Sequence, residues 1–149
     1  MEWLNRLAGT IVGLDTAPLI YFIERHPRYL PLVRTFFQSM EAGSFSVVTS
    51  ALTLSEVLVQ PYRKGDMALA AKYSGILLNA PNLKLLPISA EIADEAARIR
   101  AASGARIPDS IQLAAAKLGG ATAFLTNDDG IPVLPGMDRI VLDRLLRTQ

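Results

Sequence analysis

The predicted fold of this chain follows from the stretch IVGLDT (11–16), which continues as APLIYFIE (17–24). A short apolar run that ends on an acid and is followed by an amphipathic segment is typical of a buried parallel strand leading into a helix. Pro18 fits the first turn of that helix, where its missing N–H is not needed. Asp15 would then stand at the carboxyl end of the strand, where open α/β sheets bind their ligands.

The composition favours one domain and excludes several classes of protein. The chain has 149 residues, enough for one domain with a full core, here residues 1–149. It has no cysteine, which excludes thiolate metal sites and thiol catalysis, and its net charge of +1 demands neither nucleic acid nor membrane as a partner. No apolar run is long enough to span a bilayer, and residues 1–6 lack the basic start of a signal peptide, so a cytoplasmic location is expected.

Apolar patterns alternate between strand and helix along a core of about residues 11–142, after a short leader at 1–9. This alternation predicts an α/β fold in which a parallel sheet is covered by helices on both faces. The predicted strands are 11–15, 45–49, 83–87, 121–126 and 139–142, and the predicted helices are 17–24, 31–42, 51–60, 66–79, 90–103 and 108–118.

Some of these elements carry more detailed expectations. Helix 51–60 is expected to stop before Pro61, and the residues after 142 read as a polar tail. The inner face of helix 31–42 is predicted to be Leu32, Val33, Phe36, Phe37 and Met40. The inner stripe of helix 66–79 is predicted to be Met67, Ala70, Ala71, Ser74 and Leu78.

Four acids, Asp15, Glu56, Asp109 and Asp128, stand near the predicted strand ends, and each has an ordinary explanation of its own. Asp15 can cap its helix, and Glu56 has the Thr-x-x-Glu spacing of a capping box with Thr53. Asp109 lies in a first helical turn, where the helix dipole favours an anion, and Asp128 can be a turn residue.

Together these acids favour a site. Strands one, two and four end along one edge of a parallel sheet, and the helix opened by Asp109 can reach the same edge. Clustered carboxylates raise one another's pKa, and a divalent cation relieves that repulsion. Hard oxygen ligands without His or Cys suit Mg²⁺ or Mn²⁺, which act with substrate phosphates, so phosphodiester or phosphoryl chemistry is predicted.

The order of GLDT, VVTSALTLSEVL and RIPDSIQLAAAKLGGATAFLTND resembles a PIN-domain ribonuclease of the VapC-like toxin type over residues 11–142. The resemblance implies a three-layer α/β/α sandwich with a five-stranded parallel sheet, and a Mg²⁺- or Mn²⁺-dependent endoribonuclease that cleaves RNA by metal-assisted hydrolysis, with one metal or two. Carried over by position, the catalytic and metal-binding acids are the four above. The supporting polar residues are Thr16, Thr126, Asn127 and Asp129.

The resemblance leaves two points open in this chain. Asp128 and Asp129 are adjacent, so either can be the fourth acid; the Thr-Asn-Asp context favours Asp128, and Asp129 can assist through water. The leader before the first strand is longer than is usual for the family.

The partners follow from the resemblance and from surface charge. RNA is the implied substrate, and a cognate antitoxin is expected to place a basic side chain among the acids. Arginines and lysines around the acids can contact RNA phosphates, although charge runs are usually solvated surface. The apolar N-terminal helices can seat a partner helix or a second copy, so a homodimer is expected. The candidate rim residues are Arg25, Arg28, Arg63, Lys64 and Arg106.

Two other functions are compatible with parts of the pattern. In a non-catalytic PIN-like binding module, the acids would hold an arginine of a partner. In a phosphotransferase or receiver-like domain, Asp15 would accept the phosphoryl group. The second alternative lacks an acid two residues after Asp15, and Lys117 lies in the middle of a predicted helix.

Overall fold

A five-stranded parallel sheet lies at the centre of the computed structural model, which describes residues 1–148. The strand order is β3-β2-β1-β4-β5. The strands are β1 (Ile11–Leu14), β2 (Ser46–Ser50), β3 (Leu83–Leu86), β4 (Ala123–Thr126) and β5 (Asp138–Val141). The register pairs Val12 with Val47 on one side and with Ala123 on the other, so β1 is the central strand.

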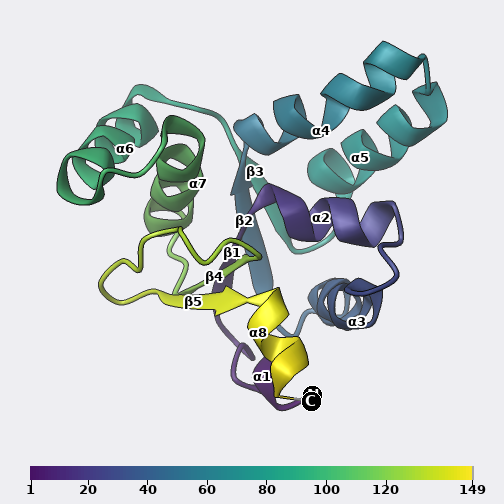
Figure 1. Ribbon diagram of the computed structural model, residues 1–149, viewed down its shortest axis with the longest axis horizontal. Coiled ribbons are helices and arrows are strands. Elements are labelled where there is room, and N and C mark those ends of the chain that lie inside the picture. The colour runs from purple at the N-terminus through teal and green to yellow at the C-terminus, as the bar shows by residue number, and fades with distance from the viewer. Residues whose placement is uncertain (149) are drawn as a thin grey trace.

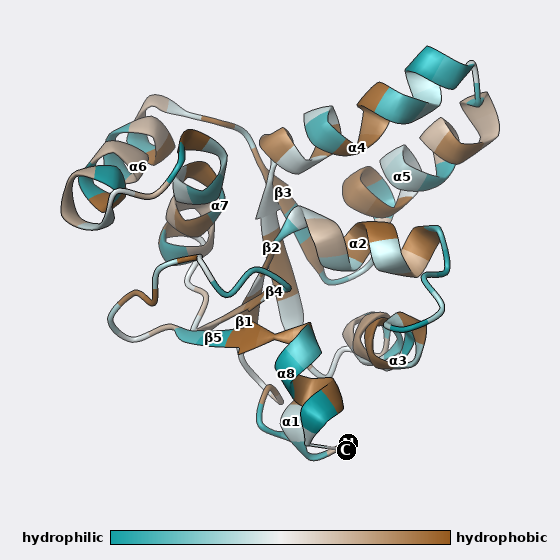
Figure 2. Cartoon of the chain, in the orientation of Figure 1, coloured by the Kyte–Doolittle hydropathy of each residue, from teal (hydrophilic) through white to brown (hydrophobic). Residues whose placement is uncertain are grey.

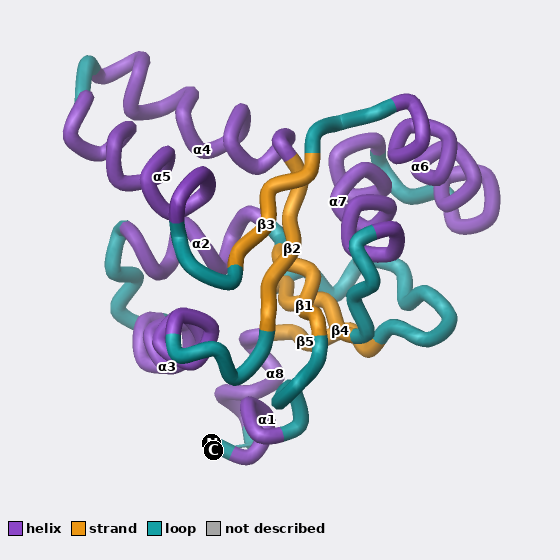
Figure 3. The backbone as a smooth tube through the Cα atoms, turned by 180° about the vertical axis from the view of Figure 1, so that it is seen from behind, coloured by secondary structure: helices purple, strands orange, loops and turns teal. Residues whose placement is uncertain are grey.

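Helices cover both faces of the sheet, as Figure 1 shows and as Figure 3 confirms from behind. One face carries α6 (Ala90–Ser103) and α7 (Ile107–Leu118). The other carries α1 (Glu2–Asn5), α2 (Thr16–Ile23), α3 (Leu30–Glu41), α4 (Ala51–Lys64), α5 (Met67–Asn79) and α8 (Leu142–Arg147). The predicted three-layer α/β/α architecture with five parallel strands is confirmed. None of the helices in residues 1–148 has the length and apolarity needed to cross a bilayer.

Alternate residues of the strands feed two separate cores. Val12, Leu14 and Leu125 point toward α2 and α3, whereas Val48 and Phe124 point toward α6 and α7. Gly13 lies on the α7 side, where an added Cβ would come within 2.5 Å of Ala116 Cβ. A side chain at this position would therefore push α7 off the sheet, which explains a glycine inside a central strand.

Most predicted elements are present with small shifts of their ends, and the inner face of α3 is confirmed residue by residue. The leader forms the short helix α1, whose Trp3 is buried and stacks on Phe36 with ring centroids 6.2 Å apart. Brown residues of α3 face the interior in the hydropathy colouring of Figure 2. The leader is thus part of the core.

Three predictions about helices were wrong. Helix α4 continues through Pro61 to Lys64 and ends at Gly65, because Pro61 is buried and tertiary packing offsets the lost backbone bond. The residues after 142 form helix α8 and bury Leu142. The buried face of α5 is Ala70, Tyr73 and Leu77, while the predicted Met67 and Leu78 are exposed and Ala71 and Ser74 are not buried.

Candidate functional site

The polar residues that follow β1, β2 and β4 lie at one edge of the sheet, because these three strands are neighbours in the order β2-β1-β4. Asp15 follows β1 directly, and its backbone N–H donates to Leu125 O of β4 at 2.9 Å. Helix α4 begins immediately after β2, at Ala51, and carries Glu56 in its second turn. The edge predicted from the sequence is therefore formed by the carboxyl ends of adjacent strands.

Asp15 is held by two hydrogen bonds from neighbouring elements. It is the N-cap of α2, where its Oδ1 accepts the N–H of Thr16 at 2.8 Å. Its Oδ2 accepts the hydroxyl of Thr126, at the end of β4, at 2.7 Å. Partial burial raises the pKa of Asp15, and the charges of Asp109 and Glu56 raise it further, against the lowering effect of the two hydrogen bonds. Asp15 is thus both a helix cap and a member of an electrostatically crowded group.

Glu56 is tied to the same group through Thr16, whose hydroxyl donates to Glu56 Oε1 at 2.9 Å. The capping-box explanation of Glu56 is wrong for this chain, because the N-cap of α4 is Ser50 and not Thr53. The Ser50 hydroxyl accepts the N–H of Leu52 at 3.2 Å. Glu56 is therefore free of a capping role and faces the threonine that follows Asp15.

A buried polar network supports this side of the edge, and the sequence analysis did not identify it. Gln112 of α7 is 2% exposed, and its Nε2 donates to Thr53 Oγ1 at 2.6 Å and to Thr16 Oγ1 at 3.3 Å. Its Oε1 accepts the Ser50 hydroxyl at 3.0 Å. A glutamine inside the run IQLAAA was the available signal, since a buried polar side chain needs partners.

On the other side of the edge, an arginine bridges the remaining two acids. Arg106 Nε donates to Asp109 Oδ2 at 3.2 Å, and Arg106 Nη2 lies 3.8 Å from Asp128 Oδ2. Asp128 Oδ1 accepts the N–H of Gly130 at 2.8 Å. The adjacent Asp129 turns away from this group and pairs with Arg144 of α8 at 2.9 Å. Asp128, and not Asp129, thus shares Arg106 with Asp109.

Asn127 has a structural role at the same turn. Its Oδ1 accepts the N–H of Asp143 at 2.8 Å, and its Nδ2 donates to Tyr21 Oη at 3.2 Å. It therefore joins the end of β4 to the start of α8 and to α2.

The candidate rim residues are not all near the acids. Arg25 and Arg28 lie beyond the C-terminal end of α2, opposite Asp15, and Arg28 pairs with Asp143 at 2.9 Å. Arg63 and Lys64 form the last turn of α4, whereas Glu56 lies near its start. Arg106 contacts the acids directly. Lys117 pairs with Glu95 at 2.6 Å on α6, so it gives no support to a receiver-like role for Asp15.

The donor chemistry of this edge fits a hard divalent cation. No group of three or more acidic or histidine side chains within residues 1–148 already encloses a metal position. A Mg²⁺ ion does not require such a cage, because it is usually held by one or two carboxylates, several waters and substrate phosphates. Burial is the main cause of the raised pKa of Asp15, and the charges of Asp109 and Glu56 add to it; a bound cation would favour the ionised carboxylate against both effects.

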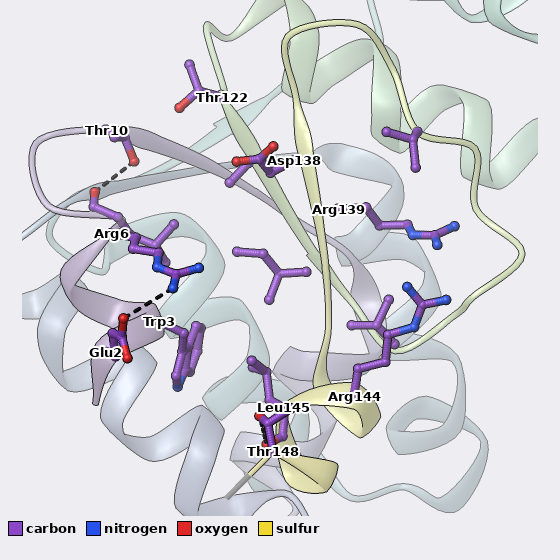
Figure 4. Close-up of a pocket in the computed structure, with 15 residues that line it drawn as sticks. Glu2, Trp3, Arg6, Thr10, Thr122, Asp138, Arg139, Arg144, Leu145 and Thr148 are labelled. Atoms are coloured by element: carbon purple, nitrogen blue, oxygen red, sulfur yellow. Dashed lines mark hydrogen bonds and ion pairs between the residues drawn. The ribbon is translucent and has the colours of Figure 1, made fainter.

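A groove of about 990 Å³ lies elsewhere, between the N-terminal helix and the last strand and helix. Figure 4 shows its walls, which include Trp3 and Arg6 on one side and Arg139, Arg144 and Leu145 on the other. None of the four acids lines it. The candidate site is thus an edge of charged groups that is separate from this groove.

Comparisons with known proteins identify the family and the fold. The family model described as the PIN domain matches residues 12–136. No curated protein matches the sequence.

Solved structures match over most of the chain. VapBC2 from Rickettsia felis, bound to a DNA fragment from its promoter, is similar with a TM-score of 0.68 and 16% identity, over 88% of this chain and 98% of the other. FitAcB from Neisseria gonorrhoeae has a TM-score of 0.62 and 20% identity, over 89% and 97%. A DNA-bound VapBC from Salmonella typhimurium has a TM-score of 0.59 and 18% identity, over 89% and 98%. At these identities the similarity establishes a shared fold.

Proposed function

Because the chain belongs to the PIN domain family, we propose that it is a Mg²⁺- or Mn²⁺-dependent endoribonuclease that acts from the acidic edge of its sheet. The observation that carries this proposal is the position of Asp15 at the carboxyl end of the central strand, where Thr16 joins it to Glu56 and where burial, and to a smaller extent the charges of Asp109 and Glu56, raise its pKa. All the donors are carboxylates, as a hard divalent cation prefers.

Asp15, Glu56, Asp109 and Asp128 would hold the cation, which when bound supplies charge stabilisation at the phosphodiester and a water of lowered pKa. Thr126 and the N–H of Thr16 orient the two oxygens of Asp15. The Thr16 hydroxyl orients Glu56.

Water is the nucleophile in this proposal, because the chain offers no activated side chain at the edge. There is no cysteine, and His26 is the only histidine. The Nδ1 atom of His26 accepts the N–H of Arg28 at 3.1 Å, beyond the end of α2 and away from Asp15.

The test is cleavage of single-stranded and structured RNA by the purified chain with Mg²⁺ or Mn²⁺, with and without EDTA. We expect cleavage that needs the cation and that Asp15→Asn abolishes. The matched control is Asp94→Asn, which removes an exposed acid that is paired with Arg98 on α6. Undiminished cleavage in EDTA, or equal loss in both variants, would contradict the proposal.

A toxin role is part of the proposal, since the similar solved structures include complexes described as VapBC and FitAcB. We infer a cytoplasmic toxin that forms a homodimer and is held by an antitoxin, whose basic side chain would pair with the acids. Co-expression with the neighbouring genes is expected to yield a stable complex. If no complex forms and the chain alone does not slow growth, a stand-alone nuclease replaces the toxin.

Calorimetry distinguishes a nuclease from the alternative function, a non-catalytic binding module. A nuclease site is expected to bind Mn²⁺ in the parent and to lose that binding in Asp109→Asn. A protein that binds a basic peptide at the edge, but no metal, would be such a module instead.

A further inference from the structure

Arg106 occupies a position that is unfavourable for an arginine. It is the N-cap of α7, and its side chain makes no capping hydrogen bond. N-cap positions favour Ser, Thr, Asp or Asn, whose oxygens accept the free N–H groups of the first turn. A positive charge there also opposes the positive end of the helix dipole. Neither capping nor the helix dipole therefore gives a reason for this residue.

The backbone at Arg106 is nevertheless firmly placed. Arg100 Nε donates to Ala105 O at 2.9 Å, and the N–H of Ala105 donates to Ser103 Oγ at 3.2 Å. The carbonyl of Arg106 accepts the N–H of Ser110 at 2.9 Å. The loop thus presents the guanidinium at the start of α7, on the side of the sheet edge.

The guanidinium meets carboxylate oxygens that the proposed metal site needs. Arg106 Nε contacts Asp109 Oδ2 at 3.2 Å, and its Nη2 lies 3.8 Å from Asp128 Oδ2. Asp128 has its other oxygen committed to Gly130 N–H, so Oδ2 is the one that remains for a cation. The arginine and a metal ion would therefore compete for Asp128 Oδ2, and the arginine also offsets the charge of Asp109.

We propose that Arg106 is an internal counter-ion of the acidic edge, which a divalent cation must displace from Asp109 and Asp128, so that Arg106 sets the metal affinity of the site. This inference rests on the proposed function. The displacement is feasible because the Arg106 side chain is 76% exposed and only the Asp109 side of the pair is largely buried, and an ion pair with one charge in solvent is weak. A released guanidinium stays at the edge, where it can pair with a substrate phosphate.

The experiment is calorimetric titration of the full chain with Mn²⁺ and Mg²⁺, without RNA. Arg106→Gln removes the counter-ion, and Arg106→Ser also supplies a favourable N-cap, which secures folding of a second variant. The matched control is Arg144→Gln, which removes an exposed arginine that is paired with Asp129, next to Asp128. Both Gln variants lose one positive charge, so they change the net charge of the protein equally.

We expect both Arg106 variants to bind the metal about two- to tenfold more tightly than the parent, as the loss of two weak ion pairs implies. Arg144→Gln is expected to leave the affinity unchanged. Equal affinities in the parent and the Arg106 variants, or an equal gain in Arg144→Gln, would overturn the inference while leaving the metal site intact. No metal binding by any variant would overturn the proposed function itself, and this inference with it.

Discussion

The two sides of the acidic edge are held in place by different forces. On one side, Asp15 and Glu56 are oriented by hydroxyl and amide groups, which a buried glutamine connects to the core. On the other, Asp109 and Asp128 are held by the exposed Arg106. The buried hydrogen bonds of Gln112 to Ser50 and Thr53 join neutral groups and are insensitive to salt, whereas the ion pairs of the exposed Arg106 are weak and screened.

The two sides of the edge therefore differ in how easily they can rearrange. The first side rests on a fixed frame, because Ser50, Thr53 and Gln112 are satisfied inside the protein and leaving one unpaired is costly, although Glu56 itself is exposed. The second side can rearrange at little cost, which suits a pair of acids that must exchange one cation for another. Four experiments test this difference between the two sides of the edge.

The largest effect is expected for Asp15→Asn. Changes to groups that merely support a metal ligand cost about 10–100-fold, so losing this acid should reduce RNA cleavage by more than about 100-fold. The fold should persist, because the amide oxygen can still accept the Thr16 N–H. Cleavage rates and circular dichroism measure the two outcomes. Cleavage within tenfold of the parent would remove Asp15 from the site.

Gln112→Leu tests the buried frame. The change leaves the hydroxyls of Ser50 and Thr53 without their amide partner, so the free energy of unfolding should fall by about 1–3 kcal/mol. The loss should be the same at low and high salt in urea denaturation. The control Gln38→Leu changes an exposed glutamine of α3 and should stay within about 0.5 kcal/mol of the parent. Equal losses in both variants would show that the network has no special role.

Arg106→Gln tests the charged side in the same assay. Without metal, it should lower the free energy of unfolding by less than about 1 kcal/mol, and the difference should vanish at high salt. Arg98→Gln, which breaks an exposed pair with Asp94, is the control and should behave alike. A loss that persists at high salt would mean that Arg106 is part of the rigid frame, contrary to the comparison.

The smallest effect concerns the pH dependence of stability without metal. Because the folded protein raises the pKa of Asp15, it binds that proton more tightly than the unfolded chain does. The contribution of Asp15 to the free energy of unfolding should therefore increase as the pH falls from above the raised pKa of the folded protein to the ordinary Asp pKa of about 4. It should be lost as the pH rises above the raised pKa. Asp15→Asn should lack this component in melting curves between pH 3 and 7. An identical pH profile in parent and variant would contradict the assignment.

The sequence was sufficient to predict the buried face of a helix where the spacing of apolar residues defines one face only. Helix α3 has one apolar face, and all five of its predicted inner residues are buried. Helix α5 has apolar residues around much of its circumference, among them Met67, Leu69, Ile76, Leu77 and Leu78, so the period did not select one face. Packing against α4 and β3 decided its rotation and buried Tyr73. Pro61 likewise predicted the end of a helix, but in the structure it is buried and lies inside α4.

By itself, the sequence determined which acids stand at the ends of which strands, because an apolar run and the polar residue that ends it are adjacent in the chain. The Ser50–Gln112 and Thr16–Glu56 contacts join residues 62 and 40 positions apart. Only the strand order and the rotation of α4 and α7 determined which oxygens meet, and so which hydroxyls a buried glutamine joins and which two acids share an arginine. Those relations depend on packing between distant segments, which no local pattern encodes.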